Sequence, residues 1–114
     1  IFLIMARKGI IPFVLSETFS TAGATKWGED CNKDVGFVKM TAAHAVTFDS
    51  AVVGEPGDTV VVFNDHSGDV NVIITPEPLS DADADTHTLP TKSYVTVMYH
   101  PDNGWLFMGA TDVT

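Results

Sequence analysis

Short β-branched runs separated by polar turns fill residues 45–110, and this pattern strongly restricts what the chain can fold into. Runs rich in Val, Ile, Thr and aromatic residues, bounded by Gly, Pro, Asn and Asp, are typical of β-strands. A D-H-S-G-D sequence at residues 65–69 predicts a hairpin loop. Only residues 42–44 hint at a helical turn. The sequence predicts strands over residues 35–41, 45–49, 59–64, 70–75, 94–99 and 105–109.

This spacing of many short strands indicates an all-β fold, which we expect to be a small antiparallel β-sandwich or a jelly-roll-like barrel. The last two predicted strands form a hairpin around the P-D-N-G turn at residues 101–104. Period-two alternation places Trp105 and Phe107 on one face of the last strand. Leu106 and Met108 then lie on the other face, so both faces are apolar. A strand of this kind favours burial between a core and a partner subunit over an exposed carbohydrate platform.

The N-terminal part lacks a clear period, and we expect residues 1–30 to form an extended arm on a body at residues 31–114. Pro12 interrupts the apolar run at residues 9–15, which favours an edge or an extended segment. Residues 16–28 are rich in Ser, Thr, Ala and Gly, as irregular segments are. Two interpretations remain open. The arm buries its apolar residues on another surface, or it wraps its own domain.

Length and cysteine content set further bounds. A chain of 114 residues is the size of one domain and can bury a core without disulfide bonds. Cys31 is the only cysteine, which excludes an intrachain disulfide and a C-x-x-C zinc or redox site. We expect it to be an inert thiol. The apolar run at residues 1–5 precedes Arg7 and Lys8, the reverse of the order in a secretory signal, and it is too short to span a membrane.

Charge is distributed unevenly along this acidic chain, whose formal net charge is −9. Residues 1–40 carry five bases and four acids, whereas residues 41–114 carry one base and eleven acids. Phosphate neutralisation needs Lys and Arg, so the sequence excludes nucleic acid and anionic membrane surfaces as expected partners. The acidic body is interpreted as a solvated exterior. In a sharper interpretation, the near-neutral N-terminal part docks while the body faces water.

A run of alternating carboxylates at Asp81, Asp83 and Asp85 begins in the way an EF-hand loop begins. The sixth position, where the loop requires glycine, is Thr86, and the twelfth, which supplies a bidentate acid, is Lys92. The EF-hand interpretation therefore fails. We expect a solvated acidic loop that binds no structural metal.

No other motif predicts chemistry. The chain has no G-x-S-x-G motif and no phosphate-binding glycine loop. The histidines stand near predicted loops or strand ends without ligand spacing, and we interpret them as ordinary surface groups. The sequence therefore predicts no catalytic, cofactor-binding or metal-ligating residue and no enzyme activity. The four histidines are His44, His66, His87 and His100.

A resemblance emerges from several of these segments taken together. A "G-D" opens the strand T-V-V-V-F-N, a "V-x-V" strand follows, an "L-P" precedes a Val- and Thr-rich strand, and "N-G-W" leads to the last strand. This set resembles a small β-module of tailed-bacteriophage virion proteins, with an acidic insertion at residues 76–87. The segments that carry it are residues 57–64, 67–72, 89–90, 93–99 and 103–109.

The resemblance implies a virion structural protein that forms a homotrimer. Because the sequence shows no repeats of the kind found in fibre shafts, we expect a capsid decoration (cement) protein that binds the major capsid protein and stabilises the head. It would be synthesised in the host cytoplasm and reside on the capsid surface, where the N-terminal arm would clamp neighbouring capsid subunits. The alternative is a tail-fibre or tail-tip module that binds a receptor or carbohydrate.

Overall fold

The computed structural model describes residues 15–49, 58–75, 85–101 and 104–112. These residues form nine β-strands and no helix, so the described part contains no helix able to cross a membrane. The strands are β1 (Leu15–Phe19), β2 (Gly23–Lys26), β3 (Val35–Met40), β4 (His44–Asp49), β5 (Thr59–Asn64), β6 (Val70–Thr75), β7 (Asp85–Leu89), β8 (Ser93–His100) and β9 (Gly104–Asp112).

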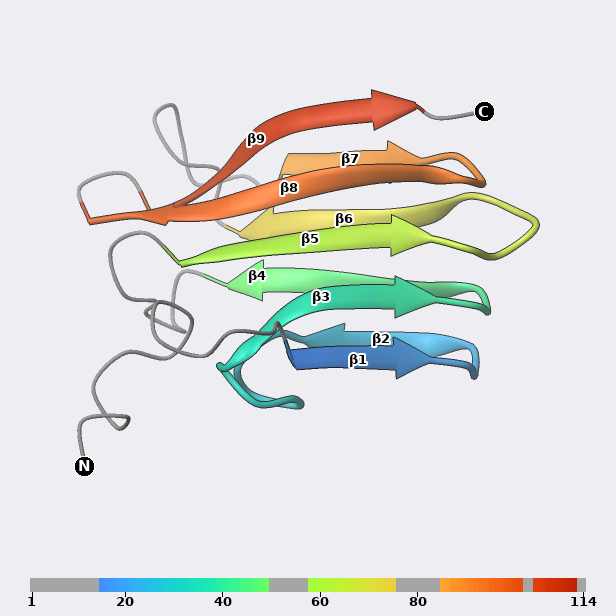
Figure 1. Cartoon of the computed structure of the whole chain (residues 1–114), viewed down its shortest axis with the longest axis horizontal. Helices are drawn as coiled ribbons and strands as arrows, with labels where there is room; N and C mark the ends of the chain where they lie inside the picture. The colour runs from blue at the N-terminus through green and yellow to red at the C-terminus, as the bar shows by residue number, and fades with distance from the viewer. Residues whose placement is uncertain (1–14, 50–57, 76–84, 102–103, 113–114) are drawn as a thin grey trace.

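The strands are divided between two sheets that lie as two layers (Figure 1). One sheet has five strands in the order β1-β3-β5-β8-β9, and the other has four in the order β2-β4-β6-β7. From β1 to β6 the chain changes sheet after every strand. The turns from β1 to β2, β3 to β4, β5 to β6 and β7 to β8 all lie at one end of the molecule (Figure 1). The first six strands therefore form three stacked strand-turn-strand units.

The stacking of these units makes both sheets mixed. β1, β3 and β5 pair in parallel, as do β2, β4 and β6, while β7, β8 and β9 pair antiparallel to their neighbours. The all-β prediction is confirmed, but the prediction of an antiparallel sandwich is wrong. The jelly-roll expectation is not confirmed, because jelly rolls are built from antiparallel Greek keys. Parallel pairing arises because each turn carries the chain into the other sheet, and the next unit starts again in the same direction.

The first and second units are separated by the same number of residues in both sheets. Phe19 pairs with Met40 in the five-stranded sheet. Gly23 pairs with His44 in the four-stranded sheet, so both pairings join residues 21 positions apart. This structural repeat went unrecognised in the sequence, because the two units share size and turn length more than residue identity.

The core lies between the two sheets and is built from strand residues of both. Alternation puts every second residue inward, as in β4, where Val46 is 1% exposed and Phe48 is 0% exposed. The ring of Trp105 is 5.0 Å from that of Trp27 and 5.1 Å from that of Phe48, centroid to centroid. The Trp27 indole nitrogen donates a hydrogen bond to the Val35 carbonyl at 3.1 Å. These aromatic rings join the two layers.

Residues 15–30 do not form an arm. They supply β1 and β2, which pair with β3 and β4, and Trp27 is fully buried in the core. The exposed pattern of β1 and the Ser, Thr and Gly content of β2 concealed these strands, since both are sheet edges held by one neighbour each. Of the two interpretations, residues 15–30 follow the one in which the segment packs on its own domain. Residues 1–14 lie outside the described residues.

The two predicted hairpins have different outcomes. β8 and β9 pair antiparallel, with Tyr99 opposite Trp105 and His100 opposite Gly104, so the last hairpin is confirmed. The hairpin predicted around residues 65–69 is wrong, because β5 and β6 belong to different sheets. A tight polar turn can join two strands of one sheet or two strands of different sheets. The residues of the turn therefore do not specify whether the strands pair with each other.

Candidate functional site

The outward side of the five-stranded sheet is unusually apolar. Buried residues alternate with half-buried ones that point away from the core along β5, in β3 from Phe37 onward, and in β8 as far as Met98. The register aligns Phe37 with Val61, and Phe63 with Tyr94, across neighbouring strands. We call this surface the apolar face. Its apolar members are Phe37, Val61, Phe63, Tyr94, Met98 and Leu106.

An open apolar depression of about 350 Å³ lies on this face, lined by Phe37, Val61, Phe63 and Tyr94. Three strands contribute to it, so its shape is fixed by the sheet and not by a loop. A half-buried aromatic side chain on a sheet surface gains little free energy from burial until something covers it, since that gain scales with the apolar area removed from water. The depression can therefore take an apolar side chain.

A cluster of charges stands beside the aromatic part of the face. The Lys92 ammonium lies 5.9 Å from the centroid of the Phe63 ring and forms an ion pair with Asp65. The Lys39 ammonium lies 3.8 Å from the other carboxylate oxygen of Asp65. The hydrogen bond from Lys92 holds the pKa of the Asp65 carboxyl below its usual value, against an opposing effect of desolvation, and Lys39 adds to the lowering. We call the cluster of Lys39, Asp65 and Lys92 the charged margin of the apolar face. Its two cations and one carboxylate give it a net positive charge.

Lys92 has a backbone conformation that is uncommon for a residue with a side chain. Its φ is 62°, in the left-handed region that glycine and asparagine prefer. The position closes the turn into β8, where the Ser93 amide donates to the Pro90 carbonyl at 3.2 Å. The Lys92 amide donates to the Asn64 carbonyl at 2.8 Å, which anchors this conformation. The turn thus presents the ammonium beside Asp65 and Phe63 in spite of the local preference.

Asn64 connects the two turns at this end of the molecule. Its side chain is 0% exposed, and its amide nitrogen donates to the carbonyls of Gly68 and Leu89, each at 2.8 Å. Its side-chain oxygen accepts from the His66 amide at 2.8 Å. A buried amide with all these bonds is a structural group, because losing it would leave several backbone groups unsatisfied. It fixes the β5–β6 turn against the β7–β8 turn.

His44 is the buried histidine that sequence reasoning missed. It is 8% exposed, and its ring stacks on Phe19 with centroids 4.5 Å apart and planes inclined by 2°. Its Nδ1 lies 2.9 Å from the Thr21 carbonyl oxygen, which can only accept, so Nδ1 donates. In the neutral ring Nε2 then accepts from the Thr25 hydroxyl at 2.6 Å. The expectation of a surface histidine is wrong here, because the histidine side chain links the first two units.

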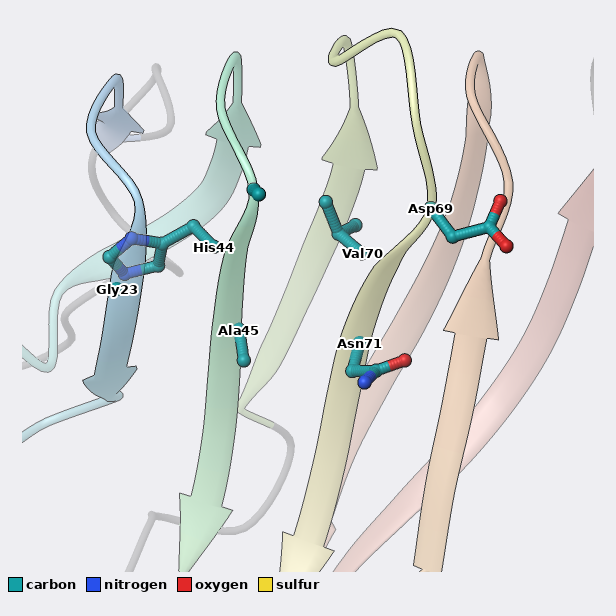
Figure 2. Close-up of a pocket in the computed structure, with 7 residues that line it drawn as sticks. Gly23, His44, Ala45, Asp69, Val70 and Asn71 are labelled. Atoms are coloured by element: carbon teal, nitrogen blue, oxygen red, sulfur yellow. The ribbon is translucent and has the colours of Figure 1, made fainter.

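A second, more polar depression of about 210 Å³ lies next to His44 on the four-stranded sheet. Figure 2 shows that the His44 ring points toward Gly23, whereas the side chains of Asp69 and Asn71 point toward the opposite side. The Asn71 side-chain oxygen accepts a hydrogen bond from the Thr88 hydroxyl at 3.2 Å. The polar groups do not converge on a common point, as the groups of a catalytic or polar ligand site must. The depression is lined by Gly23, Ala43, His44, Ala45, Asp69, Val70 and Asn71.

The outward side of the four-stranded sheet has a different composition, and we call it the polar face. Lys26 on this face forms an ion pair with Asp49, with the ammonium 3.6 Å from the carboxylate oxygen. Ile73 is its one large aliphatic residue among the described positions. Its other outward residues are small or polar: Ala24, Ala45, Thr47, Asn71, Thr75, Thr86 and Thr88.

No family model, curated protein or solved structure matches this chain. The resemblance to phage virion modules therefore rests on the sequence segments themselves.

The remaining predicted residues fall as follows. Trp105 is 1% exposed, so it is a core residue and cannot serve as an exposed carbohydrate platform. Phe107 also packs against the core and Met108 is 49% exposed, which confirms the predicted alternation of the last strand. Cys31 is half-buried, and burial raises the pKa of its thiol, while the backbone hydrogen bond from Gly28 lowers it. This disfavours the reactive thiolate, in line with an inert role.

The predicted acidic loop falls largely outside the described residues. Asp81 and Asp83 are not described, and Asp85 begins β7. Within the described ranges, no group of three or more His, Cys, Asp and Glu residues lies close enough to hold a metal ion. The expectation that the acidic loop binds no metal stays a prediction.

Proposed function

We propose that this chain is a structural protein of a tailed-phage virion, a capsid decoration (cement) protein that binds the outer capsid surface and stabilises the head. The observation that carries the proposal is the apolar face. Among fifteen acidic residues in the chain, none occupies a described outward position of β3, β5 or β8. Depletion of charge around aromatic residues is the compositional mark of an interface core. A surface of this kind suits a protein that works by covering, and being covered by, other subunits.

The proposed partners are further copies of the chain, in a homotrimer, and the major capsid protein. Nucleic acid and membrane are not proposed as partners, because the net charge of −9 disfavours binding to phosphate and to anionic lipid. We propose no enzymatic role, cofactor or metal. The mechanism is mechanical: apolar surface buried across subunit junctions opposes the pressure of the packaged genome. We also propose that the two facing sheets form a β-sandwich.

One observation favours the alternative, a tail-fibre or tail-tip module. The three stacked strand-turn-strand units have the parallel geometry of solenoids, in which one unit contacts only its neighbours. A stack of this type can be lengthened at an open edge, as a shaft requires. The decoration proposal is preferred because the apolar character lies on a sheet face, across the stacking direction, where it would pack against a flat neighbour.

Image reconstruction of virions that carry this chain distinguishes the two proposals. We expect density for the chain over the capsid shell, repeated with the capsid symmetry, and reduced thermal stability of heads from a phage lacking it. Density confined to the tail tip would contradict decoration and support the alternative. Purified virions without the chain in either place would contradict both.

A further inference from the structure

The apolar depression is a surface feature that the folded chain leaves uncovered. Phe37, Val61, Phe63 and Tyr94 line it, and none of them belongs to the buried core. They come from three adjacent strands and stand in register, so their side chains form one continuous surface. Aromatic and aliphatic side chains in this arrangement are typical of the core of a protein interface, where a partner covers them.

The charges on and around the apolar face bear on which partner can cover it. Two copies of a chain with a net charge of −9 repel each other wherever their carboxylates meet. The described outward positions of β3, β5 and β8 carry no carboxylate, and their one formal charge is that of Lys39. Lys39 and Lys92 surround Asp65 at the margin, which leaves a positive balance there. Another copy of this acidic chain can approach this face with the least repulsion, and its acids would be attracted to the margin.

We infer that the apolar face binds a second copy of this chain and that the depression receives an apolar side chain of that copy. The same sheet offers such side chains at its two edges, where Leu15 on β1 is 37% exposed and Met108 on β9 is 49% exposed. This inference rests on the proposed structural role and extends it by naming the surface and its occupant. The polar face stays in water in the assembled state.

A matched pair of variants tests the inference. Val61→Glu puts a carboxylate in the centre of the depression, and Ile73→Glu makes the same change on an interior strand of the polar face. Sedimentation equilibrium of the full chain should show a self-associated wild type. Val61→Glu should raise the self-dissociation constant by about a hundredfold or more, since an unpaired carboxylate buried against apolar side chains loses its hydration without gaining a partner. Ile73→Glu should leave the constant within a few-fold.

A second variant guards against misfolding. Thr96 pairs with Val61 and is already polar, so Thr96→Glu places a carboxylate on the same face with less change in strand packing. Near-ultraviolet circular dichroism of the buried Trp27 and Trp105 reports whether each variant is folded. If Val61→Glu does not fold, Thr96→Glu decides, and it should dissociate while folded. Folded variants that stay associated would overturn the inference, as would equal dissociation by Ile73→Glu.

The wild type separates this inference from the proposed function. A wild type that is monomeric in solution but decorates capsids would overturn the self-interface and leave the decoration role standing, with the capsid protein as the occupant of the face. A wild type that associates through this face but is found nowhere on the virion would support the interface and contradict the decoration role.

Discussion

The outward positions of β5 carry Thr59, Val61 and Phe63, whereas those of β4, an interior strand of the other sheet, carry Ala45, Thr47 and Asp49. Both strands bury their alternate residues equally well in the shared core. The inward residues therefore explain the fold, and they are similar in the two sheets. The outward residues differ in composition, which points to the apolar face as the place to look for function in the described part of the chain.

Truncation should have the largest effect, since it damages both sheets together. Deleting residues 1–27 removes β1, β2 and the fully buried Trp27. We expect the truncated chain to lose cooperative thermal unfolding, because two edge strands and a central core ring disappear. Deleting residues 1–14 instead should preserve the melt. A folded 28–114 fragment would contradict the assignment of β1 and β2 to the body and would support the interpretation of the N-terminal segment as an arm.

The shared core provides the next largest effect. Trp105 contacts Trp27, Phe48 and Tyr99, with ring centroids 5.0–5.1 Å apart. Trp105→Ala leaves a void between the sheets, and we expect the free energy of unfolding to fall by about 3–5 kcal/mol in chemical denaturation. Thr86→Ala, at an exposed position of the polar face, is the control and should change it little. Equal effects of the two variants would show that the interior is not where the structure places it.

A reciprocal exchange tests the contrast between the faces directly. Phe63→Thr gives the apolar face a residue typical of the polar face, and Thr47→Phe does the reverse. Both positions are half-buried, so each change should alter the stability of the folded monomer by only about 1 kcal/mol. Light scattering should show weaker self-association for Phe63→Thr and new, less specific association for Thr47→Phe. Unchanged association in both variants would remove the distinction between the faces.

The smallest expected effect concerns the charged margin. Lys92 lowers the pKa of the Asp65 carboxyl in the folded state, so the folded chain binds fewer protons there than the unfolded chain. The resulting stabilisation is present above the usual carboxyl pKa and is lost as the pH falls through the lowered value. Melting temperatures of Asp65→Asn should lie slightly below wild type near neutral pH and converge with it in acid. A gap that widens in acid would contradict the assigned direction.

Strand positions in the body could be predicted from sequence, and the reason is physical. The run Thr59–Asn64 is strongly apolar, which specifies a strand but not which of its faces is buried. Val70–Thr75 alternates, so its pattern specifies both the strand and its buried face. The Trp105 turn and hairpin were also predictable, because a P-D-N-G turn and an apolar strand are local signals. Residues with an unambiguous local pattern kept their predicted roles.

The strands that were missed depend on their neighbours. Leu15–Phe19 and Gly23–Lys26 are mostly exposed, and they are strands because β3 and β4 offer them pairing partners. Asp85–Leu89 was predicted to be part of a loop for the same reason, since it is held by β6. Sheet membership is a long-range property, which explains why the β5–β6 turn was predicted to form a hairpin and why the parallel stack went unseen.

Only part of the candidate site could be predicted from the sequence. The apolar character of both faces of the last strand could be read from the sequence, and the subunit contact inferred from it stays a prediction. The apolar face itself is assembled from β3, β5, β8 and β9, whose register cannot be inferred from one strand. The burial of His44 had no sequence signal, because its partners Thr21 and Thr25 belong to a unit that lacks an apolar pattern. A search for the equal spacing of the S-T-A and T-A-A turns could have found the first two units.

Protection of single cysteines tests most directly that one face is covered by a second copy and the other is not. In a Cys31→Ser background, Val61→Cys and Ile73→Cys each place one thiol at the centre of one face. We expect the alkylation rate of Val61→Cys to fall as protein concentration rises, while that of Ile73→Cys stays constant. Rates that do not depend on concentration at either position, or protection of Ile73→Cys in place of Val61→Cys, would contradict the assignment of the apolar face as the self-interface.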